Sequence, residues 1–409
     1  MSKLTVGIIR EGKVPPDKRV PLTPLKCQEA MTVFPELKIV VQSSTVRCYH
    51  DQEYRDLDIE VREDMRQCDV LMGVKEVPLA ELIPNKTYFF FSHTIKEQPH
   101  NQALLRAILQ KNITLIDYET LTNVKGERTV AFGRYAGIVG AYNGIMAYGK
   151  KFKIFDLHPA HLCLDIEDME EEYFKVKALP PIKIAVTGGG RVAHGIMEVL
   201  DKMGIRKVSV YDYLYLKFTE PVYTQLHSSD YNRRRDGRVW DNVDFYQNPH
   251  EYESTFDKFT PVTDILMAGA YWNPAAPRLF TAADMQRSNF KIKTIADITC
   301  DVEGSIPCTK RASSIPEPVY DYNPFTQELE PAFSKPENIT VMAVDNLPCE
   351  LPRSASRDFG RQLIDEVFPH LLNNDAEGIL TRATISKNGQ LTERYAYLKA
   401  YAAGNSVNI

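Results

Sequence analysis

Short apolar runs that end abruptly at polar residues recur through the first third of the chain. They are Leu4–Ile9, Lys38–Val41, Val70–Val74, Tyr88–Phe91 and Ile113–Ile116. Each run is continuous rather than alternating, which is typical of parallel strands that are covered on both faces. Segments with helical spacing of apolar residues separate them, as in Gln102–Gln110. Strands that alternate with helices predict a parallel α/β sheet.

A second α/β pattern begins at Ile182, after a Gly- and Ala-rich segment over 136–148 that predicts a closely packed helix. IKIAV predicts a strand, the glycines at 188–190 a tight turn, residues 191–203 a helix, and VSVYD at 208–212 the next strand. A polar segment over 213–262 follows. Further elements are listed by residue range: strands at 264–268, 294–298 and 340–344, a helix over 358–372, and a last helix from about 392.

The glycine turn has the spacing of a dinucleotide site. Gly188, Gly190 and Ala193 give G-x-G-x-x-A between the predicted strand and helix, so a pyrophosphate can approach the backbone at a helix N-terminus. Asp212 follows Gly188 by 212 − 188 = 24 residues, where a carboxylate binds an adenosine ribose and repels a 2′-phosphate. This predicts NAD rather than NADP. The basic triplet Arg233–Arg235 is interpreted as a solvated loop, although it could neutralise a phosphate.

Composition narrows the function classes. The chain has 409 residues, enough for two domains, with 44% hydrophobic and 25% charged residues. The net charge of 49 − 54 = −5 does not favour nucleic acid or an anionic membrane. No apolar run reaches the roughly 18 residues of a membrane span, and the first apolar segment is too short for a signal peptide. Seven scattered cysteines without metal-ligand spacing predict free thiols in the cytoplasm and no metal site.

Titratable residues stand where the predicted strands of the first unit end. Lys75, His93 and Glu119 each follow an apolar run, and Arg19 follows the first. Ligands bind at the carboxyl ends of parallel strands, and a histidine there exchanges protons near neutral pH. Lys75 could act as a base if burial and a nearby cation lower its pKa, whereas Glu76 would oppose this. From spacing alone, solvated strand ends or backbone caps explain these residues at least as well as catalysis does.

These residues lie in longer motifs that resemble a known family. The motifs are KRVPLTP (18–24), GVKEVP (73–78), FFSHTIKEQ (90–98), LIDYETL (115–121), VAFGRYAG (130–137), GAYWNPAAPRL (269–279), ADITCDVEGSI (296–306) and VDNLPCELPRSAS (344–356). Together they resemble saccharopine dehydrogenases of the L-lysine-forming type, also called lysine–2-oxoglutarate reductases. That family belongs to the alanine dehydrogenase and transhydrogenase superfamily, and the resemblance covers most of the chain.

The resemblance implies an oxidoreductase of lysine metabolism that interconverts saccharopine with L-lysine and 2-oxoglutarate. It implies two Rossmann-like α/β domains with the active site in the cleft between them. The catalytic domain would comprise 1–135 and 352–409, and the NAD-binding domain 136–351. Lys75 and His93 fall on the catalytic acid–base pair. The substrate positions are Arg19, Gln98, Arg128, Phe132, Thr299, Cys300 and Asp301, and the dinucleotide positions are Gly188, Gly190, Arg191, Val192, Asp212, Tyr271, Ile298, Val344, Asp345, Asn346 and Leu347.

Alternatives remain open on the sequence. One is an alanine dehydrogenase-like reaction on a small amino acid, which needs fewer cationic contacts than saccharopine with its three carboxylates. Another is an NADP-dependent lysine–2-oxoglutarate reductase, because the polar segment 213–262 resembles that domain of bifunctional enzymes. A third is a protein that binds the dinucleotide without catalysis. The oligomeric state, monomer or dimer, is open as well.

Overall fold

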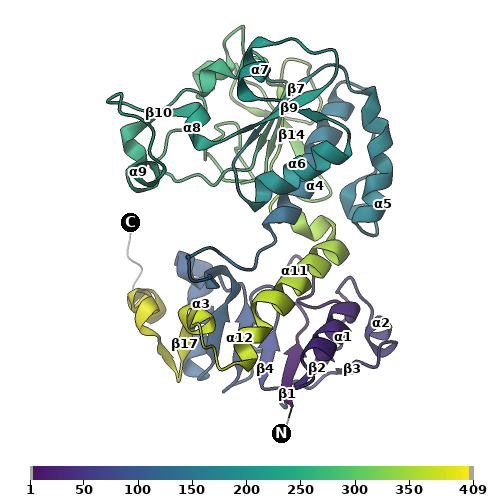
Figure 1. The fold of residues 1–409 in the computed structure, drawn as a ribbon, viewed down its shortest axis with the longest axis vertical. Helices are drawn as coiled ribbons and strands as arrows, with labels where there is room; N and C mark the ends of the chain where they lie inside the picture. Colours follow the sequence, from purple (N-terminus) through teal and green to yellow (C-terminus); the bar gives the residue numbers. More distant parts are fainter. Residues whose placement is uncertain (1–2, 405–409) are drawn as a thin grey trace. The chain divides into compact units, whose positions relative to one another are not determined.

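The computed structural model describes residues 3–404, which divide into two compact units. Unit 1 comprises the chain up to Phe132 together with the chain from Pro352 onward, and unit 2 is Gly133–Leu351. Each unit is built around its own sheet (Figure 1). The prediction of parallel α/β architecture is confirmed, because most strand pairs in both sheets are parallel.

The sheet of unit 1 is parallel except at its C-terminal edge. The first strand pairs in parallel with two neighbours, and the C-terminal hairpin pairs antiparallel with β6. This hairpin turns at Asn388–Gly389. In spatial order the strands are β18 (Gln390–Leu391), β17 (Thr384–Lys387), β6 (Thr114–Asp117), β5 (Thr87–Phe90), β4 (Val70–Met72), β1 (Leu4–Ile8), β2 (Leu37–Gln42) and β3 (Glu60–Arg62).

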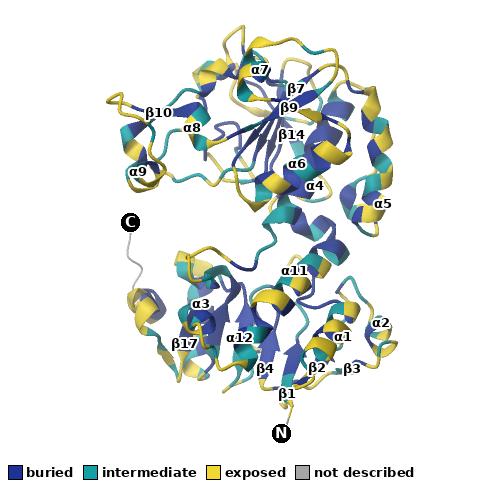
Figure 2. Ribbon diagram, viewed as in Figure 1, coloured by how far each residue is buried: buried dark blue, intermediate teal, exposed yellow. Residues whose placement is uncertain are grey.

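Hydrophobic side chains cover both faces of this sheet, which explains its continuous apolar runs. Phe89 packs into a buried cluster with Phe359, whereas Phe90 packs into a second cluster with Leu105 on the other face. Figure 2 shows the central strands as buried. The helices of unit 1 are α1 (Pro24–Val33), α2 (Asp51–Arg55), α3 (Gln102–Gln110), α11 (Pro352–Glu366), α12 (Phe368–Leu372), α13 (Ile379–Ala383) and α14 (Lys399–Ala403).

Unit 2 contains a second mostly parallel sheet. Its antiparallel members are β14 and β15, at the edge next to β16. In spatial order the strands are β15 (Leu329–Glu330), β14 (Val319–Tyr322), β16 (Ile339–Met342), β13 (Thr294–Asp297), β12 (Ile265–Ala268), β7 (Lys183–Thr187), β9 (Val222–Leu226) and β8 (Arg206–Lys207). A separate hairpin joins β10 (Asn232–Arg234) to β11 (Tyr252–Ser254).

The Gly- and Ala-rich segment forms a long buried helix of unit 2, α4. This helix packs against α6, which follows the glycine turn. A Cβ atom on Gly137 would lie 2.0 Å from the carbonyl oxygen of Val192, so only glycine permits this approach. The helices of unit 2 are α4 (Gly133–Lys151), α5 (Ile166–Glu170), α6 (Arg191–Lys202), α7 (Val210–Tyr215), α8 (Ser228–Tyr231), α9 (Asn242–Gln247) and α10 (Ala282–Met285).

Three local predictions are wrong. Residues 210–215 form the helix α7 rather than a strand, because Ser209 caps it by accepting from the N–H of Asp212. The strand that pairs with β7 on this side is β9, inside the polar segment 213–262, for which no strand was predicted. The predicted helix over 358–372 begins earlier, at Pro352, and breaks at Val367, because Pro369 cannot continue α11.

Candidate functional site

Lys75 and His93 leave the sheet of unit 1 at neighbouring strand ends. β4 and β5 are adjacent and parallel, and the N–H of Phe91 donates to the carbonyl of Val74 at 3.0 Å beyond the last paired strand residues. Lys75 follows Val74 directly, and His93 follows Phe91 by two residues. The two titratable side chains therefore start from the same carboxyl edge, where ligands of parallel sheets bind.

The carboxyl group of Glu11 fixes the backbone at Lys75. Its oxygens accept from the N–H of Val74 at 2.6 Å and from that of Lys75 at 2.8 Å. Burial lowers the pKa of Lys75, and the nearby cations Arg19 and Lys13 lower it further against acidic neighbours. A lysine so placed loses its proton more readily than an exposed one, as a catalytic base requires.

His93 is held by Glu76, the residue after Lys75. Its Nδ1 lies 2.5 Å from Glu76 Oε1, and Lys13 Nζ lies 3.3 Å from the other carboxylate oxygen. Burial alone would raise the pKa of Glu76, but the bond from His93 and a backbone bond lower it to about 2. Because the ionised carboxylate only accepts, Nδ1 carries a proton. The backbone of His93 has a positive φ of 52°, a conformation that is uncommon for non-glycine residues.

Arg19 is buried at the same edge and is already ion-paired. Its Nε and Nη2 donate to Asp17 at 3.0 Å and 2.6 Å, and its guanidinium lies 4.2 Å from the ring centre of Phe132. Burial raises the pKa of Asp17, but Arg19 more than offsets this and holds it well below its usual range. Arg128 lies over Phe91, whose ring is 6.0 Å from that of Phe132. Arg19, Arg128 and Phe132 thus gather around the end of β5.

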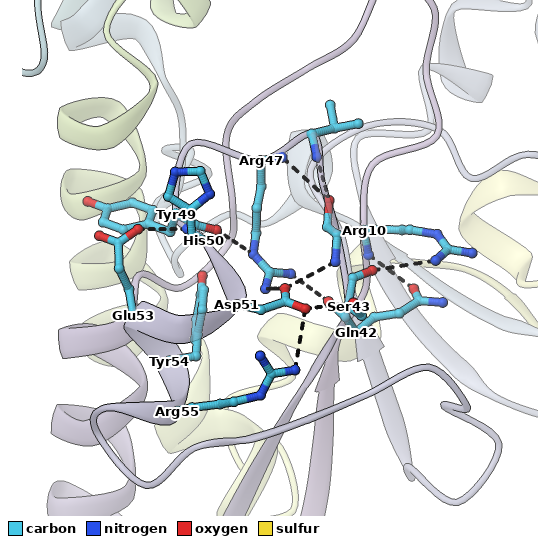
Figure 3. A network of polar contacts seen from close by, with 12 residues as sticks. Arg10, Gln42, Ser43, Arg47, Tyr49, His50, Asp51, Glu53, Tyr54 and Arg55 are labelled. Atoms are coloured by element: carbon cyan, nitrogen blue, oxygen red, sulfur yellow. Dashed lines mark hydrogen bonds and ion pairs between the residues drawn. The ribbon is translucent and has the colours of Figure 1, made fainter.

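A polar network around Arg47 supports the loop that carries Arg19. Arg47 is buried, pairs with Asp51 and donates to the carbonyls of Gln42 at 2.5 Å and Tyr49 at 2.7 Å (Figure 3). The same loop donates from the N–H of Cys48 to the carbonyl of Lys18 at 2.8 Å. The network therefore fixes the backbone next to Arg19.

Two further predicted residues of unit 1 stand apart from this cluster. Glu119 pairs with Lys96 at 3.2 Å, and within residues 3–404 its Oε2 is buried without a hydrogen-bond partner. The side chain of Gln98 is exposed, and its backbone carbonyl accepts from the hydroxyl of Tyr401 at 2.5 Å. No hydrogen bond among the described contacts links Gln98 to Lys75 or His93.

In unit 2 the glycine turn has the geometry that close approach to a phosphate requires. Gly188 has a φ of +108°, and a Cβ there would lie 3.1 Å from the backbone of Ala270. Gly190 is the N-cap of α6, and a Cβ on it would meet no atom within 4 Å. The start of α6 thus offers open space at a positive helix end, with Arg191 and Val192 in its first turn. Dinucleotide binding fits this turn.

The other predicted cofactor and substrate residues of unit 2 follow β12, β13 and β16 at the same carboxyl edge. Buried Asp297 organises the loop after β13 by accepting from Thr299 at 2.6 Å and from the N–H of Cys300 at 3.3 Å. Cys300 Sγ donates to Ala343 at 2.9 Å, which joins this loop to the end of β16. The predicted residues around them are Tyr271 and Asp301, both exposed, Ile298, Val344 and Leu347, all buried, Asp345, exposed, and Asn346, half-buried.

A cavity opens beside the glycine turn. It is lined by Thr187 at the end of β7, by Ser228 after β9 and by Tyr271 and Trp272 after β12. Tyr246 of α9, which belongs to the polar segment 213–262, also lines this cavity. Such an aromatic pocket next to a phosphate-binding turn suits a flat base.

Comparisons with known proteins identify relatives of this chain. The family described as alanine dehydrogenase/PNT, N-terminal domain, matches residues 7–139. Alpha-aminoadipic semialdehyde synthase of Arabidopsis thaliana is 30% identical over 98% of this chain and 42% of its own length. The mitochondrial mouse protein of that name is 29% identical over 97% and 48%. Saccharopine dehydrogenase [NAD(+), L-lysine-forming] of Candida albicans is 23% identical over 94% and 96%.

The chain belongs to the alanine dehydrogenase/transhydrogenase superfamily, together with the saccharopine dehydrogenases. It spans about half the length of the semialdehyde synthases that it matches. Solved structures share the fold of this superfamily. An L-alanine dehydrogenase superposes with a TM-score of 0.63 at 15% identity, covering 98% of this chain and 100% of its own. A transhydrogenase from Sinorhizobium meliloti has a TM-score of 0.56 at 13% identity, covering 95% and 98%.

The prediction that Asp212 ends a strand beside the glycine turn is wrong. Asp212 lies in the first turn of α7, beyond β8. In the sheet, β9 lies between β8 and β7. Two interstrand distances of roughly 5 Å each therefore separate β8, which precedes Asp212 in the chain, from β7, which leads into the glycine turn. On this side of the sheet β7 pairs with β9, and the residue that directly follows β9 is His227.

Sequence reasoning missed several residues of the unit 1 cluster. Glu11, Lys13 and Asp17 all lie in the loop after β1, and Asp17 stands in the run DKR beside Arg19. The acidic residues between the first strand and this arginine were the available signal. Among residues 3–404, no group of three or more His, Cys, Asp or Glu could hold a metal ion. No helix in this range is both long and apolar enough to cross a membrane.

Proposed function

We propose that this chain catalyses the reversible, NAD(P)-dependent interconversion of saccharopine with L-lysine and 2-oxoglutarate. The observation that carries the proposal is the pairing of Lys75, whose pKa is lowered, with His93, held by Glu76, at adjacent strand ends. The names of the matched relatives support the same reaction class. The superfamily resemblance supports the dinucleotide.

In the reductive direction, the residues of unit 1 move the protons. Neutral Lys75 accepts the proton that the side-chain ammonium of the substrate lysine must lose before it attacks the keto carbon of 2-oxoglutarate. His93, protonated on both ring nitrogens, donates the Nε2 proton to the carbinolamine hydroxyl, which leaves as water and gives the protonated imine. A bound nicotinamide supplies the hydride that reduces this imine. Positioned acid–base groups of this kind accelerate reactions by about 10²–10⁴-fold.

The same proposal assigns the substrate carboxylates to the cations around β5. Arg128 lies at the exposed end of the cluster and can meet a carboxylate directly. Arg19 acts from within, since Asp17 already holds two of its nitrogens. Gln98, Phe132 and Thr299–Asp301 remain proposed substrate contacts.

The proposed dinucleotide contacts are the glycine turn and the strand ends beside it. They are Gly188, Gly190, Arg191, Val192, Tyr271, Ile298 and Val344–Leu347. NAD was predicted from Asp212 at a strand end, and that argument loses its physical basis because Asp212 lies in α7. The proposal therefore keeps a nicotinamide dinucleotide as the cofactor. Residues other than Asp212 decide whether its adenosine ribose carries a 2′-hydroxyl or a 2′-phosphate.

Steady-state assays test this function. NADH or NADPH oxidation is measured with lysine plus 2-oxoglutarate, and separately with pyruvate plus ammonia. The proposal predicts turnover with the first pair and a rate at least about tenfold lower with the second. The reverse order would indicate an alanine dehydrogenase-like enzyme, and dinucleotide binding without turnover of either pair would indicate a non-catalytic protein.

We also propose the cytoplasm as the compartment. All seven cysteines are free within the structure, which suits a reducing environment. The matched mouse protein is named as mitochondrial, so fluorescence microscopy of the tagged chain with a mitochondrial marker tests this point. Diffuse cytoplasmic signal supports the proposal, and co-localisation with the marker contradicts it.

A further inference from the structure

The hydrogen bonds beside β5 continue past the end of this strand through a side chain. The N–H of Phe91 donates to the carbonyl of Val74 on the β4 side at 3.0 Å. Successive N–H groups along a strand point to opposite neighbours, so the N–H of Ser92 points to the β6 side. There it donates to Oδ2 of Asp117, the last residue of β6, at 3.0 Å. A carboxyl oxygen thus takes the place of a backbone acceptor where β6 ends.

The carboxyl group of Asp117 collects two further donors. Its Oδ2 accepts from the hydroxyl of Ser92 at 2.5 Å, and its Oδ1 accepts from the N–H of Glu119 at 2.7 Å. The second bond caps the short 3-10 helix Tyr118–Thr120. The side chain of Asp117 is fully buried. Burial raises the pKa of Asp117, and the bonds from Ser92 and Glu119 oppose this rise. One buried carboxyl therefore ties the loop after β5 to the segment after β6.

The hydroxyl of Ser92 extends this support across His93 to Thr94. Ser92 Oγ accepts from the N–H of Thr94 at 3.2 Å, and the two hydroxyl oxygens lie 2.8 Å apart. Because the hydroxyl of Ser92 donates to Asp117, the hydroxyl of Thr94 donates to Ser92. Ser92 and Thr94 are both fully buried, whereas His93 between them is half-buried. The residues on either side of His93 are thus bound to each other and to the end of β6.

These bonds enclose a residue whose backbone conformation is uncommon. His93 has a φ of 52° and a ψ of 11°, in the left-handed region that glycine adopts most readily. A non-glycine residue keeps this conformation only where the surrounding contacts impose it. From this backbone the imidazole Nδ1 of His93 reaches Glu76 Oε1 at 2.5 Å. Without the bonds from Asp117, the backbone of His93 is free to adopt a commoner conformation that turns the ring away from Glu76.

We propose that Asp117 is a positioning residue, which holds the backbone of His93 through Ser92 and so aims the imidazole at Glu76 and at the substrate. The proposal rests on the proposed function for the proton that His93 transfers. The direction of the ring is a property of unit 1 alone, and it is measured without turnover.

Nuclear magnetic resonance of the full chain follows the ring of His93 directly. The chain is labelled with nitrogen-15 in histidine only, so nine imidazoles contribute signals. A short hydrogen bond to a carboxylate moves the signal of the Nδ1 proton to low field and slows its exchange with water. The signal of His93 is the one that His93→Gln removes, and Glu76→Gln should move it to higher field.

Two variants remove the support from either end. Asp117→Asn keeps the shape of the side chain but offers one oxygen to two N–H groups, so one of them loses its acceptor. Ser92→Ala removes only the hydroxyl that reaches Thr94. In both variants the low-field signal of His93 should vanish or move to higher field. The kcat for lysine plus 2-oxoglutarate should fall at least about tenfold in Asp117→Asn and about threefold in Ser92→Ala. The KM for the dinucleotide should stay unchanged.

Asp321→Asn is the matched control, because Asp321 has the same kind of contacts in unit 2. This buried aspartate of β14 accepts from the hydroxyl of Thr340 at 2.6 Å and from the N–H of Ser334 at 3.0 Å. Asp321→Asn should lower Tm by an amount similar to that in Asp117→Asn, because each variant disturbs a buried carboxyl with several donors. It should leave both the signal of His93 and kcat as in the unaltered chain.

The outcomes separate this inference from the proposed function. An unchanged signal of His93 in folded Asp117→Asn, an unchanged kcat, or an equal loss of kcat in Asp321→Asn would overturn the role of Asp117. If Asp117→Asn does not fold, Ser92→Ala decides by the same two measurements. Loss of the signal in a chain that does not turn over lysine and 2-oxoglutarate even when unaltered would support the positioning of His93 and contradict the proposed reaction.

Discussion

The carboxyl edges of the two sheets differ sharply although the sheets are built alike. In unit 1 the edge is crowded with titratable side chains that shift one another's pKa values, among them Glu11, Lys75 and Glu76. In unit 2 the edge carries the glycine turn and the loops after β12, β13 and β16, and its perturbed carboxyls, Asp297 and Glu350, are buried. The difference teaches that one architecture can supply either proton transfer or a cradle for a cofactor, depending on the loops after its strands.

The position of a perturbed group distinguishes these two roles. Burial raises the pKa of Glu11 to about 8, and this residue holds the backbone of Lys75 at an edge that ligands can reach. Burial also raises the pKa of Glu350 to about 8, but this carboxyl bonds only to buried Asn143 of α4 among the described contacts. A perturbed pKa therefore marks chemistry only where the group lies at an open edge.

Removing the amine of Lys75 should produce the largest effect. Lys75→Met is expected to lower kcat for lysine plus 2-oxoglutarate by about 100-fold or more, because the attacking amine loses its base. Dinucleotide affinity and Tm should stay as in the unaltered chain, since unit 2 carries the cofactor turn. Lys125→Met, at an exposed loop residue, is the control. A kcat for Lys75→Met within tenfold of the unaltered chain would contradict the role of this edge.

Filling the open space at Gly190 should weaken dinucleotide binding at the carboxyl edge of unit 2. Gly190→Val adds atoms where a Cβ meets nothing within 4 Å, and the extended backbone of Gly190 accepts a side chain. The fold should therefore survive with Tm unchanged. The Kd for NADPH is expected to rise at least about tenfold, because the valine occupies the approach of the pyrophosphate. Calorimetry gives the Kd, and unchanged affinity would show that the phosphates bind elsewhere.

Replacing Glu350 by a neutral residue should change the pH dependence of stability, as expected for a buried carboxyl. Its folded pKa of about 8 lies above the ordinary 4.5, so the folded state holds a proton that the unfolded chain releases. The free energy of unfolding should then fall as the pH rises from about 4.5 through 8. Glu350→Gln is expected to reduce the loss of Tm between pH 6 and pH 9 by a few degrees.

Glu317→Gln, at an exposed position of the same unit, is the matched control and should follow the unaltered chain. Glu11 contributes a slope of the same sign to all three proteins, so the difference isolates Glu350. Parallel Tm curves for Glu350→Gln and the unaltered chain would mean that the buried carboxyl has no raised pKa.

The smallest expected effect comes from Lys13, which lowers the pKa of Lys75 after burial and Arg19 do. Removing a nearby cation favours the protonated lysine, so the pKa of Lys75 should rise in Lys13→Gln. The pH at which kcat/KM increases should then move upward. Lys18→Gln, exposed in the same loop, should leave the profile in place. If this pH moved downward in Lys13→Gln, the increase in kcat/KM could not be assigned to deprotonation of Lys75.

Periodicity sufficed for much of the fold. The apolar runs before Lys75 and His93 are strands, and α3 spans the residues that its spacing predicts. The strand after α6 was misplaced, because VSVYD has strand-like residues but Ser209 caps a helix there. β9 was missed inside a segment that looks polar overall, although four of its five residues are buried. Local propensity could not reveal which of the two segments pairs with β7.

The candidate site was predictable only in part, for a similar reason. Lys75 and His93 could be identified because each follows an apolar run. Asp17 and Glu11 could not, because their contacts with Arg19 and with the backbone at Lys75 depend on how the loop after β1 folds back. His227 became visible only once the sheet order put β9 beside β7.

Transfer of isotope tests the central claim most directly. The chain is incubated with lysine, 2-oxoglutarate and NADPH or NADH that carries deuterium at the hydride position, and the product is analysed by mass spectrometry. The account predicts saccharopine with one deuterium bound to the carbon that was the keto carbon of 2-oxoglutarate. Saccharopine without deuterium, or deuterated alanine from pyruvate and ammonia in place of any saccharopine, would contradict it.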